Sequence, residues 1–181
     1  MHNIEYIQSK KISDYKPLID EFTKPELFGS AFKETVKHWC KKKNTTRKFK
    51  HRDQFWEVWL VREDNQSKAI CGLYNICHAV NKDNHIEELW LGWFGVLNRS
   101  NGLGAKILNT FLKPKAKELG ATYLMSYVNK NGAPIEFYKR HGFEVIGTVK
   151  DWILQKADGE LKPSLVEHFE DIDDYVIRFK L

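Results

Sequence analysis

The chain has 181 residues, of which 42% are hydrophobic, 29% are charged and 13% are aromatic, and its formal net charge is +5. This length supports one domain with a sizeable core and is short for two, so we expect residues 1–181 to form a single domain. No apolar run approaches the roughly 20 residues of a membrane-spanning helix and the N-terminus lacks a signal-peptide pattern, so we expect a cytoplasmic protein with no membrane segment.

The first part of the chain predicts a strand followed by two helices. Residues 3–8 alternate well enough for a strand, and we expect helices over residues 17–23 and 25–42. In the second helix, apolar side chains recur at helical spacing and predict a face turned to the core. They are Leu27, Phe28, Ala31, Phe32, Val36 and Trp39.

A dense basic run lies between His38 and Arg52. Such a run can bind nucleic acid or another polyanion, or attract a polyphosphate cofactor. Phe49 is the only aromatic residue within it and no nucleic-acid motif surrounds it, so a solvated helix end and loop is the favoured interpretation, and nucleic acid is not an expected partner. Its basic residues are Lys41, Lys42, Lys43, Arg47, Lys48, Lys50 and Arg52.

The middle of the chain predicts a hairpin and then a central strand. Residues 54–62 and 68–80 favour two strands joined by a polar turn. Gly72, inside the second, indicates a bulge or a close backbone approach. Residues 89–96 are apolar and rich in aromatic side chains, which predicts a strand buried on both faces.

A glycine-bearing loop connects this central strand to a helical run over residues 105–112. A helix start presents unpaired N–H groups and the positive end of the helix dipole, and Gly102 and Gly104 let an anion approach the main chain. Arg99 adds a positive charge. The loop therefore predicts a phosphate site, although it lacks the Lys-Ser/Thr pair of a triphosphate loop and the third glycine of a dinucleotide fold.

The elements that follow include a second buried strand. We expect the helix to bend at Pro114, because proline removes one backbone hydrogen bond, and to end at Gly120. Residues 121–128 predict a strand parallel to residues 89–96, since a helical crossover joins the two.

The C-terminal part predicts a short helix and two more strands. The helix begins at Pro134, a favourable first-turn residue, and ends at Gly142. We expect strands over residues 143–154 and 175–181. Acidic residues crowd the segment before the last strand and would suit a cationic ligand such as a polyamine or an aminoglycoside.

Two blocks of this sequence, in the right order, resemble the GNAT superfamily of N-acyltransferases. Arg99, Gly102 and Gly104 fit the Arg/Gln-x-x-Gly-x-Gly/Ala pattern of that family's pyrophosphate loop. Residues 129–143, which end in Phe-Tyr-Lys-Arg-His-Gly-Phe, are similar to its second conserved block. The resemblance implies an α/β fold with a mixed, mostly antiparallel sheet of six to seven strands, a parallel pair at the cofactor site and about four flanking helices.

The resemblance also implies that acetyl-CoA is the co-substrate and that main-chain groups hold most of it. The loop amides would bind the pyrophosphate, and the end of the central strand would bind the pantetheine arm and polarise the acyl carbonyl. Asn129 matches the family's cofactor-contacting asparagine, with Asn131 as its competitor. The implied cofactor-binding residues are Phe94, Gly95, Val96, Arg99, Ser100, Asn101, Gly102, Leu103, Gly104, Ala105, Asn129 and Asn131.

One spacing departs from the family pattern. Only Leu97 and Asn98 separate Val96 from Arg99, whereas the family usually has a longer connection there. Either the turn is tighter, or the strand ends earlier, at Phe94, and the backbone contacts shift with it.

By the same resemblance, Tyr138 is the candidate general acid that protonates the departing thiolate. A phenol near pKa 10 is a weaker acid than a thiol near 8.5, so the transfer is uphill by about 2 kcal/mol. The alternative is a tyrosine packed on the cofactor.

The resemblance also implies that Glu88 is the candidate general base for the amine, because several members of the family carry a base glutamate at this position. It lies two residues before Trp90, and strand alternation places both on one face. Glu87, His85 and a water relay remain alternatives, as does a solvated carboxylate with no catalytic role.

The leading hypothesis is an acetyl-CoA-dependent N-acetyltransferase that acts on a primary amine of a small molecule, a peptide N-terminus or a lysine. The alternative is a non-catalytic module that binds CoA or a polyanion on the same scaffold. Cys40, Cys71 and Cys77 match no zinc or redox spacing, so no metal is expected. The sequence leaves the acceptor, the acyl-chain preference and the oligomeric state open.

Overall fold

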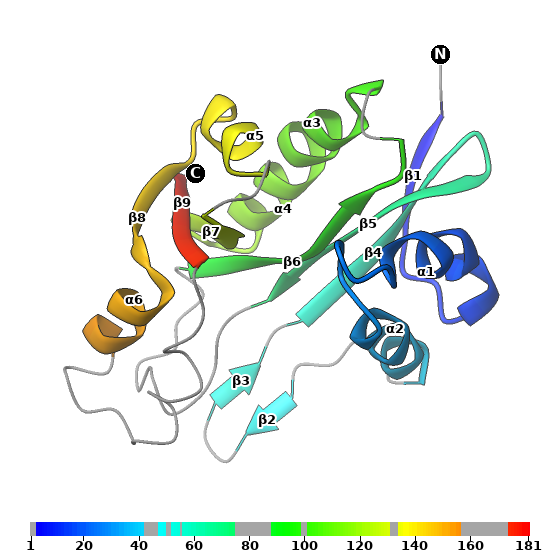
Figure 1. Ribbon diagram of the computed structural model, residues 1–181, viewed down its shortest axis with the longest axis horizontal. Helices are drawn as coiled ribbons and strands as arrows, with labels where there is room; N and C mark the ends of the chain where they lie inside the picture. The colour runs from blue at the N-terminus through cyan, green and yellow to red at the C-terminus, as the bar shows by residue number, and fades with distance from the viewer. Residues whose placement is uncertain are drawn as a thin grey trace.

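The chain folds around a seven-stranded mixed sheet with helices on both faces, shown in Figure 1 as a computed structural model. The strand order is β1-β4-β5-β6-β7-β9-β8, and every neighbouring pair is antiparallel except β6 and β7, which are parallel. The structure describes residues 3–41, 47–49, 52–54, 56–74, 88–98, 101–130, 134–156 and 174–181. The predicted fold class and its single parallel pair are confirmed.

The strands of the main sheet are, in chain order, β1 (Ile4–Ile7), β4 (Trp56–Glu63), β5 (Gln66–Tyr74), β6 (Glu88–Val96), β7 (Tyr123–Asn129), β8 (Glu144–Thr148) and β9 (Asp174–Lys180). A separate pair, β2 (Arg47–Phe49) and β3 (Arg52–Gln54), forms a two-stranded antiparallel ladder. The helices are η1 (Ile12–Tyr15), α1 (Lys16–Phe22), α2 (Ala31–Lys41), α3 (Leu103–Ile107), the π-helical η3 (Leu108–Leu112), α4 (Lys113–Glu118), α5 (Pro134–Arg140) and α6 (Val149–Lys156).

Alternating side chains of the strands divide the core between the two faces of the sheet. Leu89 and Leu124 pack against α3, η3, α4 and α5, in the same cluster as Tyr138. On the opposite face, Leu60 and Ile70 pack against α1 and α2. Trp90 packs on that second face too, against α6. Within the described residues, no helix is long and apolar enough to cross a bilayer.

The helix through Pro114 accommodates its proline with a π-helical turn. The segment η3 lies immediately before α4, and Pro114 occupies the first turn of α4. The wider hydrogen-bonding pattern of a π-turn occurs mostly as a local insertion in an α-helix. The helix then ends as predicted: Gly120 has φ +87° and the Ala121 N–H donates to the Ala116 carbonyl at 3.1 Å.

Two predicted element boundaries are wrong. The second helix starts at Ala31 and not at residue 25, because Gly29 has φ +71° and the chain before it forms turns. The predicted strand over residues 143–154 ends at Thr148, where α6 begins. Thr148 Oγ1 accepts from the Asp151 N–H at 3.1 Å and donates to the Asp151 carboxylate at 2.7 Å, which is a helix cap.

A left-handed cap ends α5 and accounts for the spacing of Tyr138, Gly142 and Phe143. The Phe143 N–H donates to the Tyr138 carbonyl at 3.1 Å, and the Gly142 N–H donates to the Lys139 carbonyl at 3.0 Å. Gly142 has φ +85°, and the Phe143 and Tyr138 rings are 5.2 Å apart. This is a Schellman motif, in which glycine takes the left-handed residue and the next side chain packs back on the helix.

Gly142→Ala is expected to destabilise the protein by about 1 to 2 kcal/mol, because an added Cβ is strained at positive φ. That Cβ would also lie 3.1 Å from the Phe179 ring. Gly104→Ala is the matched control, since a Cβ at Gly104 would meet only ordinary contacts of 3.5 Å and longer. Urea unfolding of both variants measures the difference; equal stability of the two would contradict this role for Gly142.

Candidate functional site

The parallel strands β6 and β7 separate part-way along their length. Their register pairs Glu88 with Tyr123, Leu89 with Leu124 and Trp90 with Met125. Within the described ranges this ladder ends there, while β6 continues to Val96 beside β5 and β7 continues to Asn129 beside β9. Two backbone edges therefore face each other across an opening that widens from Trp90 toward Val96.

A β-bulge in β6 bends this strand away from β7. Ile70 pairs with Gly95 and Gly72 pairs with Gly92, so Cys71 alone lies opposite both Trp93 and Phe94. Trp93 has φ +51°, which is uncommon for a non-glycine residue. A bulge kinks its strand and increases the local twist, which explains why the ladder stops near this point.

The bulge also reverses which side chains face which side of β6. Leu91, before the bulge, belongs to the cluster under α3 and α5. Trp93 turns to the other face, where its ring is 5.2 Å from Phe28 and 5.6 Å from Phe32. Phe94 then returns to the α5 side, 6.2 Å from Phe137. The aromatic packing of Trp93 holds the strained residue in place.

Two glycines let neighbouring elements approach β6. A Cβ on Gly95 would lie 2.8 Å from the Phe22 ring and 2.9 Å from the Phe28 ring, so glycine is required for α1 to pack there. A Cβ on Gly72 would lie 3.1 Å from the carbonyl oxygens of Glu57 and Gly92. The predicted close backbone approach at Gly72 is thus confirmed, whereas the bulge lies in the facing strand β6, opposite Cys71.

The connection after β6 is a tight turn. The strand reaches Val96, the Leu97 N–H donates to the Lys68 carbonyl at 2.8 Å, and Asn98 has φ +53°. Of the two explanations for the short spacing, the earlier strand end at Phe94 is wrong, because β6 extends to Val96. Arg99 and Ser100, both predicted cofactor ligands, lie outside the described residues.

The start of α3 presents amide groups that the helix itself does not use. Gly102, at φ +73°, is the N-cap residue, and its carbonyl accepts the first helical bond from the Lys106 N–H at 3.1 Å. Asn101 Oδ1 accepts from the Leu103 N–H at 3.2 Å. The amides of Gly104 and Ala105 precede that first helical donor and lie at the positive end of the helix dipole. This arrangement suits an anion.

Gly104 brings the end of β6, the start of α3 and α5 together. Its Cβ position is 3.5 Å from Val96 Cγ2 and 3.8 Å from the Phe137 ring. Gly104 is not at positive φ, so backbone conformation does not require a glycine there. Its missing side chain instead keeps this junction open beside the helix amides.

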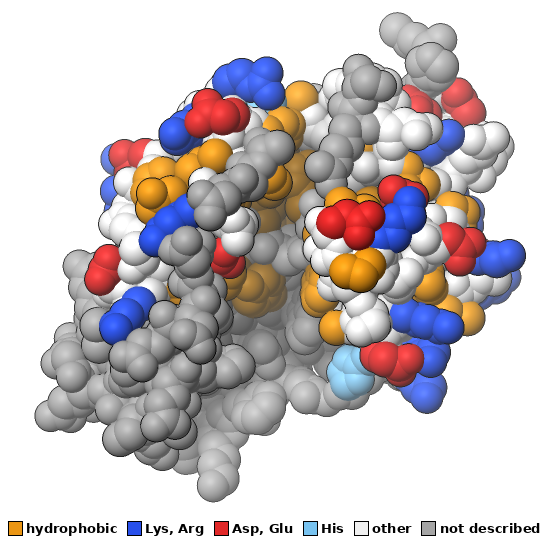
Figure 2. Space-filling view, viewed as in Figure 1, with side chains coloured by type: hydrophobic (Ala, Val, Ile, Leu, Met, Phe, Trp, Pro, Cys, Tyr) orange, Lys and Arg blue, Asp and Glu red, His pale blue; other side chains and the backbone are white. Residues whose placement is uncertain are grey.

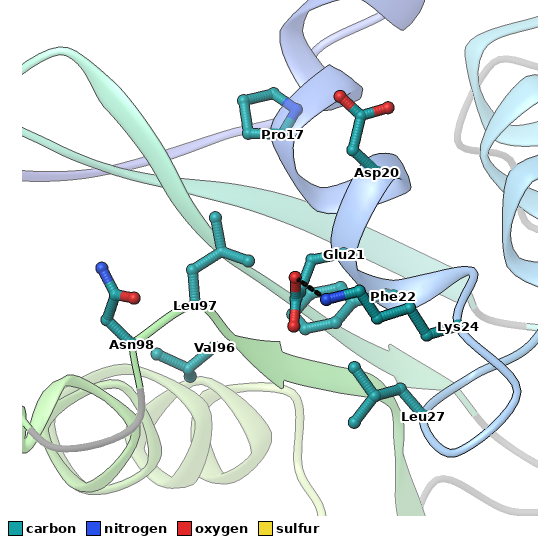
Figure 3. A pocket seen from close by; sticks show the side chains of 9 residues that line it. All are labelled: Pro17, Asp20, Glu21, Phe22, Lys24, Leu27, Val96, Leu97 and Asn98. Atoms are coloured by element: carbon teal, nitrogen blue, oxygen red, sulfur yellow. Dashed lines mark hydrogen bonds and ion pairs between the residues drawn. The ribbon is translucent and has the colours of Figure 1, made fainter.

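A pocket of about 550 Å³ lies between α1 and the end of β6 (Figure 3). Lys24 and Glu21 form an ion pair of 2.6 Å at this pocket. The lining residues are Pro17, Asp20, Glu21, Phe22, Lys24, Leu27, Val96, Leu97 and Asn98. In the view of Figure 1, the surface is hollowed between the α1–α2 side and the α5–α6 side, with hydrophobic side chains in its depth (Figure 2).

Tyr138 lies on the α3–α5 face of the sheet, close to the opening. Its side chain is only 7% exposed, and its ring is 5.2 Å from that of Phe137. Burial raises the pKa of Tyr138 to about 12, and a hydrogen bond with the Ser126 side chain acts in the opposite direction. The phenol is therefore protonated throughout the neutral pH range and able to donate.

Glu88 lies on the other face of the sheet. It is half-buried at the start of β6, and by alternation it shares a face with Trp90, whose ring is 4.5 Å from Tyr127 and 4.7 Å from Trp152. Burial raises the pKa of Tyr127, and the charges of Tyr74 and then Glu88 add to the effect. Tyr138 and Glu88 thus flank the opening from opposite sides.

The remaining predicted residues are divided between the exposed surface and the undescribed part of the chain. Asn129 is exposed at the end of β7, paired with Asp174. Asn131, Glu87, His85 and, in the basic run, residues 42–46, 50 and 51 lie outside the described residues. The prediction of a loop over this run is wrong for Arg47, Lys48 and Arg52, which belong to the β2–β3 ladder. Over the residues that are described, no group of three His, Cys, Asp or Glu side chains could hold a metal ion.

Two residues of this site were not predicted from the sequence. Trp93 forms the bulge, and no glycine or proline at that position indicates it. Ser126 is a buried polar residue, 5% exposed, within the apolar strand β7. The sequence does indicate that Ser126 is buried, because strand alternation places it on the inward face between Leu124 and Val128.

A contact between α4 and the end of α5 joins the two helices beside the site. Lys113 Nζ donates to the His141 carbonyl at 2.8 Å and to Asn109 Oδ1 at 2.9 Å. The same ammonium group lies 3.7 Å from the centre of the Phe179 ring. Burial lowers the pKa of Lys113, and burial together with the Lys113 charge lowers the pKa of His141.

Comparison with solved structures shows similarity over the whole chain at low sequence identity. A probable acetyltransferase from Staphylococcus epidermidis matches with a TM-score of 0.67 and 16% identity over 99% of both chains. A putative GNAT-family acetyltransferase from Desulfovibrio desulfuricans matches with a TM-score of 0.61 and 14% identity, also over 99% of both. N-acetylglutamate synthase from Neisseria gonorrhoeae, complexed with coenzyme A and N-acetyl-glutamate, matches with a TM-score of 0.60 and 14% identity.

That last match covers 99% of this chain but 35% of the synthase. No family model and no curated protein sequence matches the chain. At these identities the similarity concerns the fold.

Tyr138→Phe is expected to reduce the alkaline loss of stability. Between pH 10 and 12 the unfolded chain ionises this tyrosine while the native protein keeps it protonated, so unfolding releases a proton and stability falls as pH rises. The variant lacks this contribution, worth about 1.4 kcal/mol for each pH unit and about 3 kcal/mol in total. Urea unfolding at rising pH measures it; identical pH slopes for the two proteins would contradict the buried, protonated phenol.

Proposed function

The chain has the fold of the GNAT acetyltransferases, and we propose that it is an acetyl-CoA-dependent N-acetyltransferase acting on a primary amine. The observation that carries the proposal is the separation of β6 from β7 beside the start of α3. An extended thioester fits such an opening, because the strand edge and the helix amides offer hydrogen bonds to different parts of one ligand.

In this proposal the main chain anchors the donor. The amides of Gly104 and Ala105, with Arg99, bind the pyrophosphate at the start of α3. The open edge of β6 over residues 94–96 binds the pantetheine arm and polarises the acyl carbonyl. The absent side chain of Gly104 supports this, because any Cβ there would project toward Val96 and Phe137 at the same junction.

Tyr138 and Glu88 take the two proton-transfer roles from opposite faces of the sheet. Glu88 accepts a proton from the ammonium form of the acceptor, because only a neutral amine attacks a thioester. Tyr138 donates to the departing thiolate. With a pKa of about 12 against about 8.5 for a thiol, full transfer is uphill by about 5 kcal/mol, so Tyr138 acts first as a hydrogen-bond donor to the developing charge.

The acceptor class remains a primary amine. The coenzyme A and N-acetyl-glutamate in the Neisseria gonorrhoeae structure support a CoA-dependent transfer to nitrogen on this fold. The acceptor would approach from the Glu88 side, where Trp90, Tyr127 and Trp152 form an aromatic wall.

Acetyl-CoA is expected to raise the melting temperature of the protein. At a hundredfold excess over Kd, binding adds about 2.7 kcal/mol, which for a chain of this size is roughly 5 to 10 °C. Gly104→Glu should abolish the shift, because it places a carboxylate at the pyrophosphate position. Gly104→Ala, which the backbone tolerates, should retain a reduced shift and serves as the folded control.

The absence of a shift in the wild-type protein at millimolar acetyl-CoA would overturn the proposed function. Binding that persists without thiol release across a wide panel of amines would instead favour the non-catalytic CoA-binding module.

Glu88→Gln is expected to lower kcat/KM for an accepted amine by about 10²-fold or more near neutral pH. The deficit should shrink as pH rises, because an amine that is already neutral needs no base. Rates of thiol release measured across pH test this. Glu87→Gln is the matched variant at the neighbouring carboxylate, and it should not show this deficit if Glu88 is the base. A deficit that is constant with pH would contradict the base role.

A further inference from the structure

Three side chains form a hydrogen-bonded cluster between the end of α5 and the helix that continues from α3. Asn109 lies in η3, Lys113 begins α4, and His141 immediately follows α5. Lys113 Nζ lies 2.9 Å from Asn109 Oδ1, and Asn109 Nδ2 lies 3.1 Å from His141 Nδ1. Lys113 also donates to the His141 carbonyl at 2.8 Å, so His141 is held through both its ring and its backbone.

The direction of each hydrogen bond in this cluster follows from the chemistry of the groups. A lysine ammonium group can only donate, so the atom of Asn109 that faces it is the carbonyl oxygen. This orientation turns the Asn109 NH2 group, which also donates, toward His141 Nδ1. Nδ1 is therefore the acceptor, which requires a neutral imidazole with its proton on Nε2. The cluster is complete only in that protonation state.

The charges around His141 favour the same neutral form. Burial, followed by the positive charges of Lys113 on α4 and of the adjacent Arg140 on α5, lowers the pKa of His141. The η3 segment faces the ring with the uncharged amide of Asn109. The stabilisation from neutral His141 is therefore present above the ordinary histidine pKa of about 6.5, and it is lost as pH falls through the lower pKa of the native protein.

His141 is in direct contact with the two residues of α5 that lie nearest the opening. Its N–H donates to the Tyr138 carbonyl at 2.9 Å, and its ring centre is 4.7 Å from that of Phe137. The Phe137 ring in turn lies 3.8 Å from the Cβ position of Gly104 and 5.2 Å, centre to centre, from the Tyr138 ring. A change at His141 therefore acts directly on the helical turn that carries the candidate acid.

We propose that Asn109 is a positioning residue for acyl transfer, which holds the end of α5, and with it Tyr138, against the α3–α4 helix only while His141 is neutral. This inference rests on the proposed function. When His141 gains a proton, its Nδ1 becomes a donor that faces the Asn109 NH2 group. Asn109 must then turn away, and it gives up its contact with His141 or with Lys113.

The first test titrates His141 by NMR and needs no acetyl-CoA. Neutral His141 should carry its proton on Nε2, and its pKa should lie below the ordinary value of about 6.5. Asn109→Asp should raise that pKa by about one unit, a tenfold change in the ionisation constant, because a carboxylate accepts from the protonated ring. His141→Asn keeps an acceptor near the Nδ1 position and identifies the His141 signals by their loss.

The second test compares kcat of the wild type and of His141→Asn across pH, at saturating acetyl-CoA. The two values should agree near neutral pH, and the wild type should be about three- to tenfold slower at about pH 5, because only the wild type loses the contact. The ratio of the two removes the ionisation of the acceptor and of Glu88, which both proteins share. Asn109→Asp should also keep its activity at about pH 5, since its carboxylate holds the protonated ring.

The outcomes separate the two proposals. A wild-type protein that binds no acetyl-CoA, or that binds it and acetylates no amine, overturns the proposed function. Turnover with a kcat ratio that is constant with pH overturns the positioning role alone, because a merely structural contact changes kcat by the same factor at every pH. A neutral His141 with its proton on Nδ1 overturns it as well.

Discussion

One extra residue in β6 is the constraint on which the site depends. The strand must pair with β5 along its whole length and with β7 along only part of it, and the bulge opposite Cys71 reconciles these demands. The cost of the left-handed Trp93, of order 1 to 3 kcal/mol, is offset by its ring contacts with Phe28, Phe32 and Trp39. Aromatic side chains of α2 and of the turn before it thus hold β6 in the conformation in which it separates from β7.

The order of the elements could be predicted from the sequence wherever a local rule determined it. The crossover from the central strand through a helix predicted the parallel pair, and Gly120 and Gly142 predicted where two helices end. The start of α3 was predicted from the glycines that follow a buried strand. The structure adds that Gly102 adopts a positive φ, whereas the missing side chain of Gly104 leaves space beside Val96 and Phe137. These features depend on a few neighbouring residues.

Features set by tertiary packing could not be predicted in the same way. The position of the bulge at Trp93 was not predicted, because the conformation of this residue is fixed by rings that are distant in sequence. The strand predicted after Phe143 was too long, since its apolar residues fit a strand and a buried helix equally well. The local signal that distinguishes the helix from a strand there is the cap formed by Thr148 and Asp151 at the start of α6.

The contact of Lys113 with the end of α5 gives the two halves of the site a mechanical connection. The helix that begins at the glycine-bearing loop after β6 and the helix that carries Tyr138 follow different strands, but one ammonium group links them through the His141 carbonyl. The π-turn just before Lys113 fixes the rotation at which that side chain leaves its helix. The start of α3 and the end of α5 are therefore joined by a direct side-chain contact along the helices, in addition to the sheet on which both helices pack.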